Sequence, residues 1–528
     1  MTFKTSTALL SVSFAALTAS PSLADITADD IWNSYQAIAE TVGGELTATT
    51  NRDGNTVVFA DAKLHISFPG DEGSVDILYP LLSYTENGDG TLAMDLDGPQ
   101  TYSFVVTGPN AEADRISADM VITYADAELI ATGDPDDITF SYAMDGFEFE
   151  VQNLDLGELK DPEDVNFSLT GTGSATKGTS RLSLGDLVTL AGQSEITGID
   201  YSMQIADPSG GISTTNGSYE GMSNSSTITL PTGGMSIMNL AGALHDGLSI
   251  MATSKIGGSN SKTVIVADGN EVSSHTSQTM SAGPSTNTIS ANADAFQLTA
   301  DGNQIQMAFK YDENVNAGSD NISVTGFSET ALEGYVDRAT GDFRIPVSKS
   351  EEQQDFTFAF GLEGFDLDKN LWALFDPSEI LPREPATLLL NLTGKTTLLQ
   401  NLLNFEEMMQ LSDGDVPAQL NELSINDLQI SAVGASASAT GDFAFDNDDL
   451  VSFDGIPAPS GNAEVQISGA NGLIDKLIEM GLIAESDAMG ARMMMGILTV
   501  PGEGEDSLKS NLEITEDGQI LANGQRIK

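Results

Sequence analysis

The sequence predicts a mainly β fold with a few α-helices, arranged as an elongated, curved antiparallel sheet. Apolar and polar residues alternate with period two through most of the chain, as in strands that are buried on one face. Clusters of Asn, Asp and Gly separate these runs and are typical of hairpin turns. With 528 residues, 40% hydrophobic residues and 52 glycines, the chain can form a large packed core, in several domains or in one long sheet.

The first 24 residues have the pattern of a secretory signal peptide. Lys4 supplies the positive charge, residues 8–17 are apolar or small, and Ser22-Leu23-Ala24 is a small-x-small cleavage site. No later stretch contains the roughly 20 consecutive apolar residues that a transmembrane helix requires. We therefore expect an exported mature chain without a transmembrane helix. A bacterial periplasm is the expected location, because the chain has no cysteine, whereas secreted eukaryotic proteins of this size usually carry disulfides.

The charge and the missing cysteines exclude several classes of function. The chain has 21 Lys and Arg against 78 Asp and Glu, a net charge of −57, so it has no basic surface for nucleic acid. Without cysteine there are no disulfides, thiolate zinc sites or iron–sulfur clusters. An outer-membrane β-barrel is disfavoured, since only 6% of the residues are aromatic and such barrels carry aromatic girdles. The acidity is best explained as a solvated surface.

After the signal peptide, the first region, residues 25–190, begins with a helix. Thr27 and Asp30 have the spacing of a capping box, and Ile31, Tyr35 and Ile38 recur at helical spacing before two glycines. From residue 51 the period changes to two, and strands alternate with turns such as residues 87–90, Asn-Gly-Asp-Gly. The sequence therefore predicts an N-terminal helix that packs onto a β unit.

Two distant stretches share one pattern. In each, four apolar residues at every second position precede an acidic residue and a glycine. After the glycine the apolar residues again alternate, but at odd-numbered instead of even-numbered positions. The two sets are Ile138, Phe140, Tyr142 and Met144 before Asp145-Gly146, and Phe356, Phe358, Phe360 and Leu362 before Glu363-Gly364. Such a switch indicates a tight turn or a β-bulge. The stretches are either two related β units from a duplication or independent hairpins with similar turns.

The remainder forms two further regions. Residues 191–350 are rich in Ser, Thr and Gly, which suits a flexible linker, but short β-like runs favour weakly hydrophobic strands. Residues 351–528 contain the second Phe-rich stretch and helical patterns over residues 471–481 and 489–498. The second of these helices is rich in methionine, a residue that adapts to varied apolar surfaces.

The sequence predicts no catalytic residues, no cofactor and no metal site. The three histidines, His65, His245 and His275, have no metal-ligand spacing and no serine nucleophile motif nearby. A phosphate-binding loop ending at Thr396 is excluded, because Leu389 stands where that loop needs glycine. Acidic clusters in an exported protein suit calcium, but none completes a calcium-binding loop. We therefore expect a protein that is not an enzyme.

The chain resembles domain-of-unknown-function family 2125, a family of exported alphaproteobacterial proteins. The resemblance is carried by residues 29–32 (DDIW), 371–377 (LWALFDP), 381–387 (LPREPAT), 488–494 (AMGARMM) and 523–526 (NGQR). It extends along the mature chain and is least distinct in the middle region. The resemblance implies an envelope protein without an established activity, so it supplies no site residues.

Two functions fit these observations. In the first, the protein binds or carries a lipid or another apolar ligand in a groove of the sheet, lined by Phe140, Phe358, Leu362 and Met493. In the second, it is a structural or protein-interaction module of the cell envelope with no small ligand, and the same side chains are core. The expected partners are accordingly a lipid or other envelope proteins.

Overall fold

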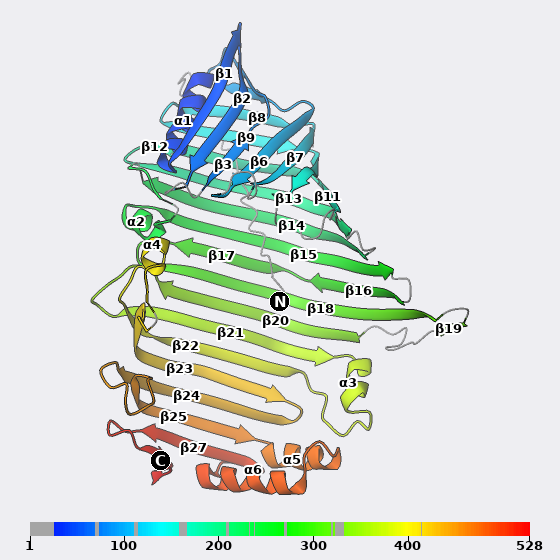
Figure 1. Ribbon diagram of the computed structural model, residues 1–528, viewed down its shortest axis with the longest axis vertical. Coiled ribbons are helices and arrows are strands. Elements are labelled where there is room, and N and C mark those ends of the chain that lie inside the picture. The colour runs from blue at the N-terminus through cyan, green and yellow to red at the C-terminus, as the bar shows by residue number, and fades with distance from the viewer. Residues whose placement is uncertain are drawn as a thin grey trace. The chain divides into compact units, whose positions relative to one another are not determined.

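The computed structural model describes residues 26–68, 73–109, 115–157, 166–206, 211–231, 233–236, 238–268, 272–317, 320–322, 332–412 and 414–528. The predicted signal peptide, residues 1–24, lies outside these ranges. The chain divides into two compact units. Unit 1 comprises Met1–His275 and Val315–Ile322, and unit 2 comprises Thr276–Asn314 and Ser323–Lys528. Both units consist mainly of antiparallel strands with a few helices, which confirms the predicted fold class (Figure 1).

The elements of unit 1 are α1 (Ala28–Thr41), β1 (Gly44–Asp53), β2 (Thr56–Ser67), β3 (Ser74–Leu78), β4 (Leu82–Glu86), β5 (Leu92–Asp95), β6 (Pro99–Thr107), β7 (Arg115–Ala125), β8 (Glu128–Asp134), β9 (Asp137–Met144), β10 (Gly146–Asp155), β11 (Asn166–Gly173), β12 (Thr176–Leu184), β13 (Leu187–Ala206), β14 (Gly211–Pro231), α2 (Leu240–His245) and β15 (Ser249–Asp268). In addition, β19 (Asp320–Ile322) pairs with the last residues of a strand of unit 2, and this short ladder is grouped with unit 1.

In several places of unit 1, two strands that are consecutive in the chain lie end to end and together occupy the position of one long strand. The long strand β13 pairs with β12 through residues 188–196 and with β11 through residues 199–206. Strands β11 and β12 therefore run end to end beside it, and β10 and β9 flank them in the same order. The predicted parity switch at Asp145 lies at one of these junctions, and it separates two strands with different partners rather than forming a hairpin.

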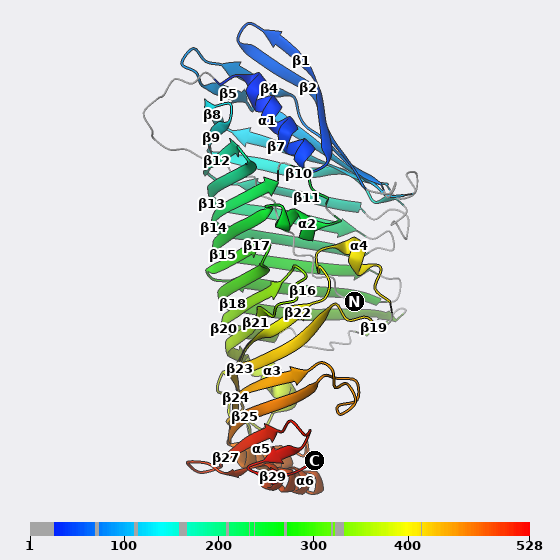
Figure 2. The ribbon, with the colours of Figure 1, turned by 90° about the vertical axis from the view of Figure 1, so that its left-hand side faces the viewer.

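Helix α1 covers one part of the sheet of unit 1 (Figure 2). The predicted capping box is confirmed, because Thr27 Oγ1 accepts a hydrogen bond from the N–H of Asp30 at 3.2 Å and the Asp30 carboxylate accepts one from the N–H of Thr27 at 2.9 Å. The Trp32 ring stacks on Phe59 with the ring centroids 4.6 Å apart. The side chains packed here form the principal core of unit 1, with Val57, Phe59, Leu92, Ile138 and Leu182 almost completely buried.

The elements of unit 2 are β16 (Val272–Ala282), β17 (Ser285–Ala291), β18 (Ala295–Ala317), β20 (Leu332–Pro346), β21 (Gln354–Leu367), α3 (Lys369–Phe375), β22 (Ala386–Leu398), α4 (Phe405–Met408), β23 (Ala418–Ala432), β24 (Ala435–Asp446), β25 (Ala458–Ser468), α5 (Ala470–Glu479), α6 (Glu485–Leu498), β26 (Val500–Pro501), β27 (Ser507–Ile514), β28 (Ile520–Ala522) and β29 (Gln525–Arg526). The first residues of β16 belong to unit 1. Both C-terminal helices were predicted within a few residues of these bounds.

The sheet of unit 2 has a simple order, in which each strand pairs with the next from β20 to β25. Strand β18 pairs with β20, and β27 pairs with β25. Bulges in the strands keep the apolar side chains of neighbouring strands on the same face of this sheet. Leu390 and Leu392 lie two apart on β22 and pair with Leu428 and Ile425, three apart on β23, so Asn426 is the extra residue. Because of this extra residue, Ile425 and Leu428 lie on the same face of the sheet although they are three residues apart.

Helix α5 is capped by a residue from outside the helix. Gly469 precedes it and has no side chain, and the Asp506 carboxylate accepts the N–H bonds of Asn471 at 3.1 Å and Gly472 at 2.9 Å. Burial alone would raise the pKa of Asp506, but these hydrogen bonds outweigh it and lower the pKa below its ordinary value. The folded state therefore favours the ionised carboxylate.

We expect Asp506→Asn to lower the free energy of unfolding by about 1–2 kcal/mol at pH 7. Because the pKa is depressed in the folded state, the stabilisation is fully present above the unfolded-state pKa of about 3.9 and is lost as the pH falls through the folded-state pKa. Urea unfolding at pH 7 and pH 3 should show a smaller difference in the free energy of unfolding between wild type and Asp506→Asn at pH 3 than at pH 7. The neighbouring exposed Glu505→Gln is the control, and an equal loss at both pH values would contradict the assignment.

Candidate functional site

The structure places the four residues predicted to line a groove in three environments. Phe140 lies in unit 1 and is only 3% exposed, because Tyr35 of α1 stacks against it with the ring centroids 6.3 Å apart. Phe358 and Leu362 lie on one face of β21 in unit 2, and Phe358 is 41% exposed. Met493 lies on α6 of unit 2 and is 63% exposed. The structure therefore brings Phe358 and Leu362 together on an accessible surface and buries Phe140 in the core of unit 1.

Phe358 and Leu362 belong to a continuous apolar face that crosses eight strands of unit 2. The strand register aligns side chains of β18, β20, β21, β22, β23, β24, β25 and β27 in rows perpendicular to the strands. Three neighbouring rows define this face. They are Leu298, Phe343, Phe358, Leu392, Ile425, Gly441, Ala463 and Leu512; Ala300, Gly341, Phe360, Leu390, Leu428, Ala439, Val465 and Ser510; and Gly302, Ala339, Leu362, Leu388, Ile430, Ala437, Ile467 and Leu508. Ser510 is the one polar side chain among them.

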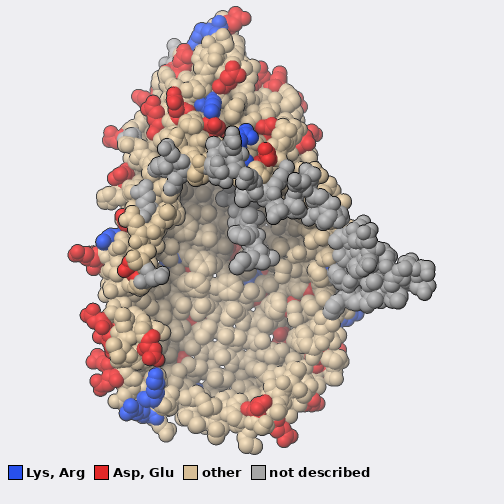
Figure 3. All heavy atoms as spheres, in the orientation of Figure 1, with Lys and Arg blue, Asp and Glu red and all other residues tan. Residues whose placement is uncertain are grey.

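The opposite face of the same strands is polar. The row that contains Thr357, the residue before Phe358 on β21, points to this opposite face. It consists of Gln297, Arg344, Thr357, Thr393, Ser424, Asp442, Asn462 and Glu513. Figure 3 shows the apolar side as a hollow surface of uncharged side chains over the strands of unit 2, with Asp and Glu gathered toward its rim. The sheet is therefore amphipathic, with the polar side fully suited to water.

The apolar face is not buried by the described residues of its own unit. Within the three rows only Ala463 and Ser510 are buried, whereas Ile430 is 47% exposed and Phe360 and Leu388 are exposed to a similar degree. Other buried side chains of unit 2, including Val347, Trp372 and Leu398, lie at strand ends, in connections or on the short helix α3. A contiguous exposed apolar surface on a folded protein marks a site for an apolar ligand or a partner.

Sequence reasoning missed most of this face. The alternation of Leu388, Leu390 and Leu392, and of Leu423 and Ile425 on the next strand, is visible in the sequence and indicates strands with one apolar side. The sequence did contain a sign of this face. Successive strands all carry the alternating pattern, and no helix long enough to cover them lies between them in the chain. That combination indicates an apolar side without a covering layer.

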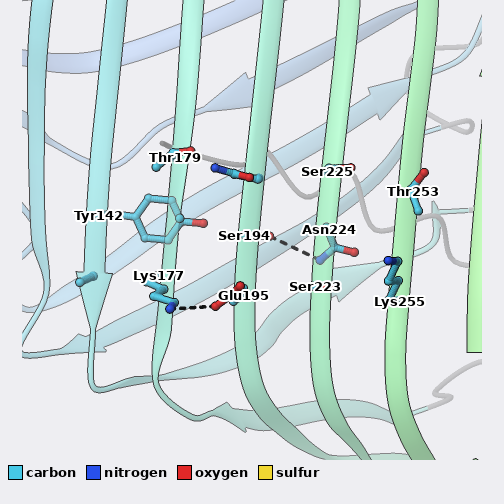
Figure 4. Close-up of a pocket in the computed structure, with 13 residues that line it drawn as sticks. Tyr142, Lys177, Thr179, Ser194, Glu195, Ser223, Asn224, Ser225, Thr253 and Lys255 are labelled. Atoms are coloured by element: carbon cyan, nitrogen blue, oxygen red, sulfur yellow. Dashed lines mark hydrogen bonds and ion pairs between the residues drawn. The ribbon is translucent and has the colours of Figure 1, made fainter. Parts of the chain in front are cut away.

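Unit 1 contains an open polar pocket of about 600 Å³. It is lined from β9, β12, β13, β14 and β15 by Tyr142, Ala143, Lys177, Gly178, Thr179, Gln193, Ser194, Glu195, Ser223, Asn224, Ser225, Thr253 and Lys255 (Figure 4). The Lys177 ammonium pairs with Glu195 at 2.9 Å, and Asn224 donates a hydrogen bond to Ser194 at 3.5 Å. These groups suit hydrogen bonding to a polar molecule, but they do not include a histidine or a nucleophile with an adjacent base.

A cluster of tyrosines lies beneath α1 in unit 1. Tyr35 is hydrogen-bonded to Tyr84, and burial raises the pKa of Tyr35 to about 12 and that of Tyr84 well above its ordinary value. Burial and the neighbouring Tyr102 and Tyr142 also raise the pKa of Tyr124. All these hydroxyls stay protonated at neutral pH, so the cluster supplies hydrogen bonds and no catalytic base.

The ionisable groups elsewhere form ion pairs and small clusters of opposite charge. His65 Nδ1 lies 2.6 Å from Asp76 Oδ1, and Lys63 lies 3.0 Å from the same oxygen. Burial would raise the pKa of Asp76, but its hydrogen bonds with His65 and Lys63 lower it overall. Among the residues that the structure describes, no group of three or more His, Asp or Glu side chains is placed to hold a metal ion. Within the same ranges, no helix is long and apolar enough to cross a membrane.

Residues 276–524 match the model of a protein family described as "Uncharacterized protein conserved in bacteria (DUF2125)". This match confirms the predicted family resemblance over these residues, and it contains the whole apolar face of unit 2. No curated protein and no solved structure is significantly similar to the chain. The family description names no activity, so the function has to be argued from the site.

Proposed function

We propose that this chain, whose residues 276–524 match the DUF2125 family, is a non-enzymatic envelope protein that binds an apolar ligand on the apolar face of unit 2. The ligand class that fits best is the acyl chain of a lipid. The observation that carries the proposal is the row pattern, in which eight paired strands present apolar side chains on one accessible side and polar side chains on the other.

The dimensions of the face suit a long, flexible hydrocarbon. Neighbouring strands lie about 4.8 Å apart, so a row across eight strands extends for about 34 Å. A hydrocarbon chain gains about 0.8 kcal/mol for each methylene group that it removes from water, and it needs no directional partners. The three rows offer such burial with a single hydroxyl, Ser510, which is itself buried. Linear chains laid side by side along the three rows would cover the exposed side chains Phe358, Phe360 and Ile430, one in each row.

The proposed location is the bacterial periplasm. It is supported by the signal-peptide pattern of residues 1–24 and by the absence of cysteine in a chain of 528 residues. An exposed apolar face is also suited to a compartment between two membranes, where lipid is available as a ligand.

Native mass spectrometry of the full protein, purified from its own envelope without detergent, tests this function. We expect an additional mass that corresponds to bound lipid, and uptake of a fluorescent acyl probe after the lipid is removed. A clean protein mass together with no probe uptake would contradict the proposal. Co-purification of a stoichiometric envelope protein in place of lipid would instead support the second function, a protein-interaction module whose partner covers the apolar face.

A further inference from the structure

Helix α6 of unit 2 is attached by a narrow part of its surface. Of its residues from Glu485 to Leu498, only Ala488 is buried. Arg492 holds the inner side, since its guanidinium donates hydrogen bonds to Asn471 at 3.2 Å and to Asp475 at 2.6 Å. The rest of the helix is available to solvent or to a partner.

The outer side of α6 is apolar from Met489 onward, after a first turn that carries the exposed acidic residues Glu485 and Asp487. Met489, Met493 and Ile497 follow one another at intervals of four residues, which places them on one stripe of the helix, and Met494 lies beside them. These side chains are 72%, 63%, 48% and 53% exposed, in that order. No acidic residue occurs from Ala488 to Leu498, although the chain as a whole has a net charge of −57. An apolar stripe that has no acidic residue beyond the first turn of its helix, in so acidic a protein, is a surface for an uncharged apolar partner.

The C-terminal end of α6 adjoins the apolar face. The Leu498 carbonyl accepts a hydrogen bond from the Ser510 hydroxyl at 2.6 Å, and Ser510 is the β27 member of the second row. Asn523 donates a second hydrogen bond to the same carbonyl at 3.1 Å. Figure 1 shows α6 beside β27, the last of the eight strands that form the face. The apolar stripe of the helix is therefore located at one end of the apolar face.

We infer that α6 docks unit 2 on the surface of a lipid bilayer whose headgroups carry no net charge, at the end of the face where a lipid would enter or leave. The role in lipid entry rests on the proposed function, but the docking itself does not. Flexible methionine side chains are suited to the irregular boundary between headgroups and acyl chains. The net charge of −57 would repel an anionic membrane, so an uncharged zwitterionic surface is the appropriate partner.

Flotation of the full protein with phosphatidylcholine vesicles in a density gradient tests this inference. We expect the wild-type protein to float with the vesicles, and the double variant Met489→Asp, Met493→Asp to lose vesicle binding by at least about tenfold, because a charge on the apolar side of an interfacial helix opposes its insertion. The matched control is Met409→Asp, Val451→Asp, two highly exposed apolar residues in other connections of unit 2, which should float like wild type.

Several outcomes would overturn the docking. These are failure of the wild-type protein to float, undiminished flotation of the α6 variant, or an equal loss in the control. Light scattering that shows a wild-type dimer that the α6 variant abolishes would assign the helix to a contact between copies and would also overturn it. Failure of the proposed function is distinguishable, because it would abolish acyl-probe uptake in solution and leave flotation unchanged. The α6 variant, in contrast, should retain probe uptake.

Discussion

Phe358→Asp is expected to reduce uptake of a fluorescent acyl probe by at least about tenfold, because an ionised carboxylate in the middle of the apolar face would have to lose its hydration under the bound hydrocarbon. Phe358 occupies the first row at β21 and packs edge-to-face against Phe343 with the ring centroids 4.9 Å apart. It is 41% exposed, so the new carboxylate can be hydrated when no ligand is bound and the unliganded fold should persist. Fluorescence titration of the delipidated protein measures the effect.

Thr357→Asp is the matched control for this prediction. Thr357 is the preceding residue on the same strand and belongs to the polar row on the opposite side of the sheet. The same charge is introduced there within one residue of Phe358, and probe uptake should equal that of wild type. If both variants lose uptake equally, or if Phe358→Asp binds the probe normally, the apolar face of unit 2 is not the ligand site.

Phe59→Ala is expected to destabilise unit 1 by about 3–5 kcal/mol, the usual cost of removing a buried aromatic side chain. Phe59 is 1% exposed, stacks with Trp32 and contacts Tyr84 edge-to-face with the ring centroids 6.2 Å apart. The substitution therefore leaves a cavity between α1 and the sheet. Urea unfolding followed by Trp32 fluorescence, in a Trp372→Phe background, reports on unit 1 alone.

Phe104→Ala provides the comparison for that measurement. Phe104 is on β6 of unit 1 and is 38% exposed, so its removal leaves little empty volume inside the protein. We therefore expect the free energy of unfolding to fall by about 1 kcal/mol or less. Similar losses for the two substitutions would show that α1 does not cover a packed core at Phe59.

The sequence was sufficient to predict the strands, the antiparallel arrangement and the N-terminal helix, because each depends on local pattern. Period-two alternation depends only on which side of a strand is apolar, and the capping box of Thr27 and Asp30 involves residues three apart. The parity switch at Glu363-Gly364 was correctly assigned to a bulge or a turn. In the structure Gly364 has φ +69, and the ladder between β21 and β22 shifts its register between Leu362 and Phe365.

The location of the apolar surface could not be predicted from local pattern. Phe140 and Phe358 occupy equivalent positions in the two Phe-rich stretches, yet one is 3% exposed and the other 41%. The difference arises because α1, about a hundred residues before Phe140 in the chain, covers that strand with Tyr35, whereas no described helix of unit 2 covers Phe358. Which strand a distant helix covers is a tertiary fact, and alternation alone carries no information about it.

The acidic, polar side of the sheet in unit 2 has a consequence for colloidal behaviour. A protein with a wide exposed apolar face would associate with its own copies through that face unless another force kept the copies apart. The net charge of −57 supplies a long-range repulsion, which salt weakens beyond a Debye length of about 10 Å at 0.1 M ionic strength. The many carboxylates therefore do more than hydrate the turns, because they let an unoccupied apolar surface remain dispersed in water until a ligand covers it.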